Sequence, residues 1–258
     1  MVLIDTHTHL FLPAFNEDRD RVIHEALTRG VEKMLLPDVD GSTTNSMLKL
    51  AEAYPDHCLP MTGLHPTSVN ANFRLELDRI KQLLGKERFW GIGETGIDLY
   101  HDRTYLDQQI ESFETHLSFA ADYGLPLIIH CRNSFNHIIR VLESHKNGPL
   151  TGIFHAFTGN TEQANRIIRL GFKIGIGGIV TFKNSGLAET IRKINPIHIV
   201  LETDSPYLAP VPKRGKRNKS SYLVYIAEKL AEIYDLPIEE IANLTTRNAD
   251  ELFGLGLK

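Results

Sequence analysis

Short apolar runs rich in β-branched residues recur along the chain, and stretches with helical spacing of apolar residues separate them. Some runs are apolar at nearly every position, as at residues 125–129, which is typical of parallel strands covered on both faces. Their starts lie roughly 20–35 residues apart, the repeat expected of strand–helix units. We expect eight strands, at residues 2–7, 33–37, 59–64, 89–93, 125–130, 151–155, 172–177 and 197–202.

The segments between these runs carry apolar side chains at every third or fourth position, the period of an amphipathic helix. One such stripe runs from Leu106 to Ala121. Thr161 is placed to cap another helix. Pro237 and Gly254 mark the expected start and end of a last helical segment.

Eight strand–helix units in 258 residues predict an α/β protein with a TIM-type (β/α)₈ barrel, for which about 250 residues are typical. A doubly wound open sheet is the structural alternative. No linker or low-complexity segment divides the chain, so we expect one domain over residues 1–258.

Composition points to a protein of the cytoplasm. A hydrophobic content of 42% and a charged content of 23% are those of an ordinary globular protein. No apolar stretch reaches the ~18 residues of a transmembrane helix, and Asp5 interrupts the N-terminal apolar run where a signal peptide would continue. Cys58 and Cys131 do not suggest a disulfide framework. We expect no membrane contact and a monomer or weak homo-oligomer.

Residues with metal-binding side chains stand where the expected strands end. His7 and His9 are two positions apart, so they project to the same side of a strand. In a parallel barrel the carboxyl ends of all strands lie on one face, where active sites are built. Any one of these residues alone would be an ordinary polar group, but an unpaired cluster at one edge would be costly to desolvate. The candidate ligands are His7, His9, Glu94, His130, His155 and Asp204, with His65 nearby; the remaining histidines, at 24, 57, 101, 116, 137, 145 and 198, are assigned no role.

The net charge of −4 argues against a generally basic surface, yet five cations fall within residues 213–219. Charge runs are most often solvated surface, but this one follows the last strand, in a loop expected at the mouth of the barrel. Arginine there can bind phosphate bidentately, and an aromatic ring can stack on a base. The expected substrate-binding residues are Arg132, Tyr207, Arg214, Lys216 and Arg217.

Several motifs in this order carry a resemblance to a known family. They include His7-Thr8-His9, Gly93-Glu94-Thr95-Gly96-Ile97-Asp98, His130-Cys131-Arg132, His155-Ala156-Phe157-Thr158-Gly159 and Glu202-Thr203-Asp204-Ser205-Pro206-Tyr207. From residue 4 to about residue 253, the chain resembles the TatD-type metal-dependent deoxyribonucleases, which belong to the amidohydrolase-like barrel group.

The resemblance implies a centre of one or two divalent metal ions and hydrolysis of DNA. It implies that His7, His9, Glu94 and Asp204 hold one ion, and that Glu94, shared between both, holds the second with His130 and His155. Mixed imidazole and carboxylate ligands suit Zn²⁺ or Mn²⁺ better than Mg²⁺, although the family is often described as magnesium-dependent.

Three positions depart from the family pattern. Asn133 stands where Asp is frequent, and Ala156 where Cys is common. Lys219-Ser220 replaces the usual Glu-Pro, which changes the charge of the loop nearest the expected substrate.

These features predict a hydrolase in which two cations activate water. Asp204 is the candidate proton acceptor, Glu94 the bridging ligand, and His65 the next candidate for the base. The expected activity is that of an exonucleolytic deoxyribonuclease acting on single-stranded DNA or frayed ends. A same-fold hydrolase of a small amide, ester or lactone is the alternative. An interaction module that binds metal without turnover is disfavoured, because the complete ligand set is present.

Overall fold

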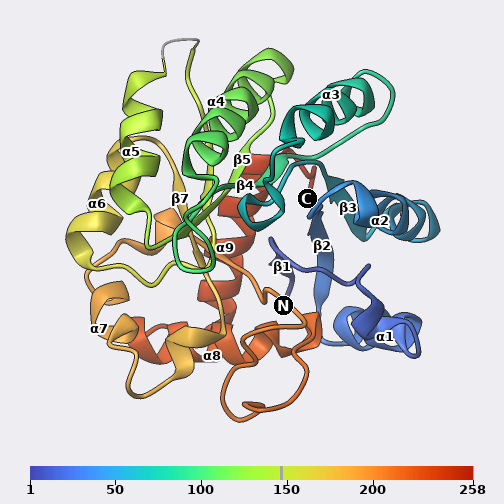
Figure 1. Cartoon of the computed structure of the whole chain (residues 1–258). Helices are drawn as coiled ribbons and strands as arrows, with labels where there is room; N and C mark the ends of the chain where they lie inside the picture. The colour runs from blue at the N-terminus through green and yellow to red at the C-terminus, as the bar shows by residue number, and fades with distance from the viewer. Residues whose placement is uncertain (146–147, 258) are drawn as a thin grey trace.

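Eight parallel strands and the helices between them form the fold of the computed structural model, which describes residues 1–145 and 148–257 (Figure 1). The strands are β1 (Leu3–Asp5), β2 (Val31–Pro37), β3 (Cys58–Met61), β4 (Ile92–Asp98), β5 (Leu127–Arg132), β6 (Gly152–Phe154), β7 (Lys173–Ile176) and β8 (Ile199–Leu201). The helices are α1 (Arg19–Thr28), α2 (Gly41–Ala53), α3 (Phe73–Leu84), α4 (Leu106–Tyr123), α5 (Phe135–Ser144), α6 (Thr161–Arg169), α7 (Leu187–Ile191), α8 (Leu223–Tyr234) and α9 (Ile238–Phe253).

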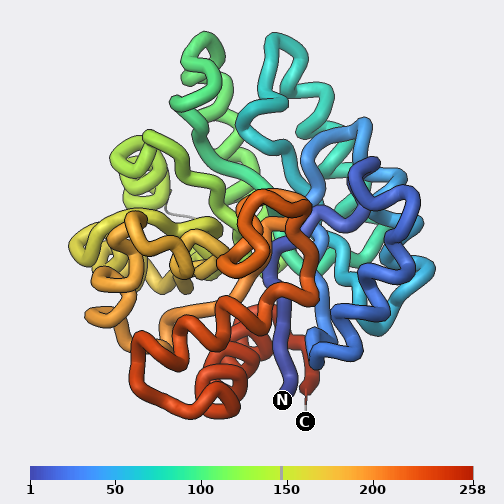
Figure 2. Tube along the Cα trace, turned by 90° about the horizontal axis from the view of Figure 1, so that it is seen from below, coloured from blue at the N-terminus to red at the C-terminus, as the bar shows by residue number. Residues whose placement is uncertain are grey.

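The strands follow one another in chain order, and the colour gradient of Figure 2 shows the chain passing around the molecule from its N-terminal to its C-terminal part. Strands β1 to β3 and β4 to β8 form two continuous parallel ladders. Short backbone contacts join the ladders at both gaps: Gly93 donates to the carbonyl of Thr62, and Thr6 donates to that of Leu201. The predicted TIM-type barrel is therefore confirmed, and the open-sheet alternative is wrong.

The barrel interior is filled by alternate residues of the strands, as the two-residue period requires. Neighbouring positions such as Leu3 and Leu36 instead pack outward against the helices. Helix α9 contributes to the interior cluster, so the apolar filling is continuous with the C-terminal helix. The cluster includes Ile4, Leu35, Leu59, Ile128, Ile153 and Val200 of the strands, with Ala249 and Phe253 of α9.

Most expected helix signals are confirmed. The stripe that begins at Leu106 forms α4, and the last helix ends at Gly254, whose positive φ of 63° suits a glycine cap. The cap predicted for α6 was wrong by one residue. Asn160, not Thr161, caps that helix, because its side chain accepts a hydrogen bond from the backbone of Gln163. Among the described residues, no helix has the length and apolar character needed to cross a membrane.

Strand β4 begins and ends later than predicted, and it contains a bulge. Ile92 pairs with Leu127 and Thr95 pairs with Ile129, so three steps along β4 match two along β5. A bulge of this kind re-aims the side chains that follow it. It brings Glu94 onto the inward face, inside the strand rather than beyond its end.

The close approach of the backbones at the junction of β3 and β4 can be tested by adding a single methyl group. A Cβ atom on Gly63 would lie 2.6 Å from the Cα atom of Gly93. We expect Gly63→Ala to destabilise the protein by about 1–3 kcal/mol through overpacking. The midpoint of thermal unfolding should fall by roughly 3–10 °C. Gly85→Ala is the control, because the nearest atom to its added Cβ lies 3.6 Å away. Equal midpoints for the two variants would contradict this close approach.

Candidate metal centre

The buried carboxylate of Glu94 lies at the centre of a cluster of imidazoles. Its Oε1 atom is 2.6 Å from Nε2 of His155 and 2.8 Å from Nδ1 of His130, and its Oε2 atom is 3.1 Å from Nε2 of His7. These side chains come from the ends of different strands and meet at the carboxyl face of the barrel. The predicted convergence of strand-end residues is therefore present in the fold.

A second carboxylate completes the cluster on the side of β8. Asp204 places Oδ1 3.5 Å from Nε2 of His9, and that nitrogen is also 3.5 Å from Oε2 of Glu94. The Nε2 atoms of His7 and His9 lie 3.2 Å apart. Three groups bring their ligand atoms within 4.8 Å of one another: His7, His9 and Asp204; His7, Glu94 and His155; and His65, Glu94 and His130.

His65 lies nearer the centre than the sequence indicated. Its Nε2 atom is 3.3 Å from Oε1 of Glu94. Its Nδ1 atom accepts a hydrogen bond from the backbone of Thr67, so the ring is held with Nε2 toward the cluster. The residue expected only as an alternative base therefore belongs to the group of potential ligands.

Opposing charges set the protonation of the cluster. Burial would raise the pKa of Glu94, but the imidazoles around it, His155 foremost, hold that pKa well below its usual range. Burial alone would lower the pKa of His9, yet hydrogen bonds to Asp204 and Glu94 raise it to about 10. For His155, burial is again outweighed by Glu94, and the pKa rises to about 9. Burial and the neighbouring His155 lower the pKa of His7 to about 4.

These features fit a site for divalent cations. Two buried carboxylates require positive charge, which the cluster alone obtains by protonating imidazoles such as His9 and His155. The facing Nε2 atoms of His7 and His9 cannot both offer lone pairs to each other. A cation would accept several of these lone pairs at once and replace the protons, and the imidazole and carboxylate donor set suits Zn²⁺ or Mn²⁺.

Two further carboxylates, those of Asp98 and Glu202, form hydrogen bonds with or beside the histidines of the cluster. Neither of them was assigned a role from the sequence. Asp98 accepts a 2.9 Å hydrogen bond from Nε2 of His130, which leaves Nδ1 to face Glu94. Buried Glu202 accepts from the backbone N–H of Ala156, next to His155. The two-residue period of a strand could have indicated the position of Glu202. This residue lies two positions after Val200, whose side chain faces the barrel interior.

A mouth cavity of about 570 Å³ opens above the cluster. Arg132 and Tyr207, both expected to bind substrate, line it. The ring of Tyr207 is 55% exposed, and Arg132 lies 4.0 Å from the ring centre of Tyr100, which is also exposed. Apolar side chains of Leu12, Val39 and Leu208 complete part of the wall.

The basic segment 213–219 makes contacts that its sequence does not reveal. Arg217 forms a 2.7 Å ion pair with Asp18, and Lys219 forms one with Glu25 of α1. These pairs fasten the loop to the α1 region. Arg214, Lys216 and Arg217 are exposed, and none of the three lines the mouth cavity.

Two histidines to which the sequence assigned no role differ in their surroundings. Buried His116 donates to the carbonyl of Ser112 and accepts from the backbone of Leu64, a structural arrangement. Burial lowers the pKa of His116 to about 4. His101 instead pairs with Asp98 and lines the mouth cavity, so it lies closer to the site than expected.

A cluster of potential metal ligands at the carboxyl end of a parallel barrel is typical of metal-dependent hydrolases. The family model described as TatD related DNase matches residues 4–254, and the chain belongs to this TatD family. An uncharacterised metal-dependent hydrolase of Bacillus subtilis, YabD, is 36% identical and aligns over 98% of this chain and 99% of its own.

Two other relatives agree with that assignment. A protein of Pantoea ananatis named as the 3'-5' ssDNA/RNA exonuclease TatD is 30% identical, over 98% of this chain and all of its own length. The crystal structure of YjjV, a TatD homologue of Escherichia coli K12, superposes with a TM-score of 0.91 at 29% identity. That alignment covers 98% of both chains.

The Asp98–His130 hydrogen bond predicts a measurable change in metal affinity. Asp98→Asn should weaken binding of Zn²⁺ or Mn²⁺ by roughly 10–100-fold, because His130 loses the anionic partner that orients its ring. Titration against a competing chelator measures the effect. Asp102→Asn, four residues further on and exposed, is the matched control. Equal affinities in the two variants would mean that Asp98 does not orient His130.

Proposed function

We propose that this protein is a metal-dependent phosphodiesterase that removes nucleotides from the ends of single-stranded DNA. The observation that carries the proposal is the position of the ligand cluster, which opens directly into a cavity edged by Arg132 and Tyr207. A guanidinium can bind a phosphate bidentately, and an exposed ring can stack on a base. The name of the Pantoea relative supports the same substrate class.

Metal binding in this proposal uses the residues expected from the sequence. His7, His9, Glu94 and Asp204 would hold one ion, and Glu94, His130 and His155 a second. His65 stands beside the second set, 3.3 Å from Glu94. When bound, the ions would lower the pKa of a coordinated water molecule and polarise the phosphoryl oxygen.

The proton-accepting role falls to Asp204. Burial would raise the pKa of Asp204, but the hydrogen bond to His9 and the nearby imidazoles lower it. The carboxylate is therefore ionised at neutral pH, and its side chain is 14% exposed, toward the cavity. It can take a proton from the attacking water, while Arg132 holds the phosphate in position.

A small neutral ester or lactone is the competing substrate class. The observation that favours it is the apolar part of the cavity wall, formed by Leu12, Val39 and Leu208. A cavity of about 570 Å³ also lies within the ~300–1,000 Å³ of small-molecule sites. The two classes differ in charge, so salt separates them.

Replacement of the proposed base should affect the chemical step. We expect Asp204→Asn to lower kcat on DNA by about 100-fold or more and to change KM little, since proton transfer acts in the transition state. Steady-state kinetics on a fluorescent single-stranded oligonucleotide measures both. Asp235→Asn, an exposed site, is the control. A rise in KM alone would reduce Asp204 to a positioning residue and make His65 the next candidate base.

Salt dependence tests the substrate class. On single-stranded DNA, log kcat/KM should fall with log salt by a slope of ~0.7 for each phosphate contact. Arg132→Gln should flatten that slope by roughly one contact and raise KM for DNA. The exposed Arg140→Gln, on α5, is the matched control and should retain the wild-type slope.

The same assay includes a neutral lactone. Wild-type protein should hydrolyse DNA more efficiently than the lactone, in a reaction that a chelator abolishes. Efficient, salt-independent turnover of the lactone, with none of DNA, would replace the proposed function by its alternative.

A further inference from the structure

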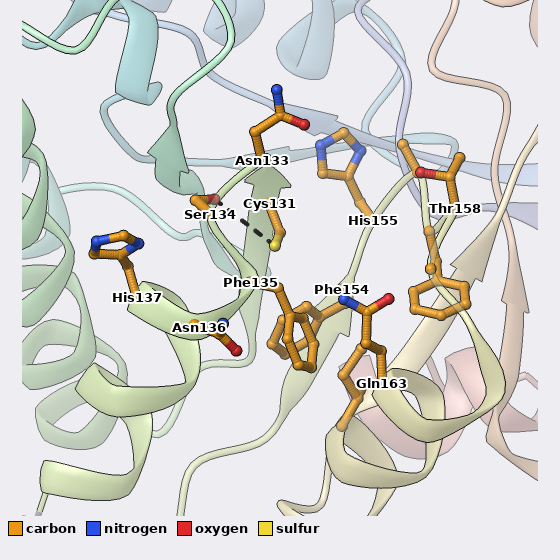
Figure 3. Close-up of a pocket in the computed structure, with 14 residues that line it drawn as sticks. Cys131, Asn133, Ser134, Phe135, Asn136, His137, Phe154, His155, Thr158 and Gln163 are labelled. Atoms are coloured by element: carbon orange, nitrogen blue, oxygen red, sulfur yellow. Dashed lines mark hydrogen bonds between the residues drawn. The ribbon is translucent and has the colours of Figure 1, made fainter.

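A second cavity, of about 410 Å³, lies beside the metal centre, between the loops that follow β5 and β6. His155 lines this side cavity and the mouth cavity alike, so the two spaces meet at a residue of the ligand cluster. Figure 3 shows Asn133 and His155 at one end of the side cavity and Gln163, from α6, at the other. A substrate that occupied both spaces would therefore pass beside His155.

The lining of the side cavity is polar but carries no Lys, Arg, Asp or Glu. Amides and a hydroxyl dominate the polar groups: Asn133, Asn136, Thr158 and Gln163. A phosphate would gain no Lys or Arg partner here, and a purely apolar group would bury these amides without partners.

The amides are available to a ligand. In the part of the chain that the structure describes, Asn133 and Asn136 are exposed, and no hydrogen bond joins their side chains to other residues. Gln163 uses its Oε1 atom to accept from the backbone of Asn160, which leaves its NH₂ group free. The half-buried ring of Phe135 adds an aromatic surface to the wall (Figure 3).

We propose that the side cavity binds the base of a nucleotide adjoining the scissile phosphodiester. This inference rests on the proposed function and specifies how its substrate is held. Asn and Gln present the paired donors and acceptors that match the edges of nucleobases, and aromatic rings match their faces. The volume falls in the ~300–1,000 Å³ range of ligand pockets, and a neutral, polar, planar ligand suits a lining that has three amides and no Lys, Arg, Asp or Glu.

The first test uses Asn136→Ala, with Asn165→Ala as the matched control. Both residues are exposed, but Asn136, in the first turn of α5, lines the cavity, whereas Asn165, on α6, lies outside the lining. For hydrolysis of the deoxyadenosine dinucleotide, Asn136→Ala should raise KM five- to tenfold and leave kcat within twofold. The KM of bis(4-nitrophenyl) phosphate, which has no base, should not change in either variant.

The second test measures binding without turnover. Ligand-observed NMR should detect adenosine bound to chelator-treated wild-type protein and to Asn165→Ala. Binding should weaken at least fivefold in Asn136→Ala. It should be lost in Asn136→Trp, whose larger side chain fills the cavity.

The results separate this inference from the proposed function. If wild-type protein cleaves DNA but Asn136→Ala matches Asn165→Ala in dinucleotide KM and adenosine binding, the base subsite is overturned and the nuclease proposal stands. If Asn136→Ala and Asn165→Ala show the same rise in KM for bis(4-nitrophenyl) phosphate, the effect of the substitutions is structural, and the base subsite is likewise overturned. If the metal-loaded wild type cleaves neither DNA nor the dinucleotide, both proposals fall.

Discussion

The buried carboxylate of Glu94 is the constraint around which the rest of the site is arranged. This carboxylate is 2% exposed and ionised. The cluster of side chains that fills the barrel interior is apolar. A buried charge persists only where partners offset the loss of hydration. Imidazoles from several strand ends provide that offset in the protein alone, and a divalent cation would provide it more completely. The same charge thus explains the crowding of histidines and the affinity for metal that the family implies.

The geometry of this carboxylate depends on the backbone beneath it. The bulge in β4 turns Glu94 inward, and the following alternate positions, Gly96 and Asp98, keep the same face beside His130. Closure of the barrel is linked to the site in a similar way. Buried Asp5 accepts hydrogen bonds from the backbone and hydroxyl of Thr203, which joins the end of β1 to the end of β8 next to the ligands.

Two cavities of different character meet at the cluster. The mouth cavity combines Arg132 with exposed aromatic and apolar side chains, whereas the side cavity is lined by three amides and no Lys, Arg, Asp or Glu. A substrate that joins an anionic linkage to a polar planar group matches both, with the linkage at the metal ligands. This division of chemistry favours a nucleic acid over a small neutral ester, because the ester would use only one of the two spaces.

The sequence by itself determined the barrel and most of the ligand cluster. Strand period and chain repeat are local properties, so the eight strands and the strand-end positions of His7, His130 and His155 could be predicted. Tertiary structure alone decided the register of β4, which depends on how its backbone pairs with β5. It also decided that Asp98 orients His130 and that Arg217 pairs with Asp18, 199 residues away in the chain. Such contacts form because the barrel closes. A local pattern of residues does not show which segments, far apart in the chain, become neighbours in space.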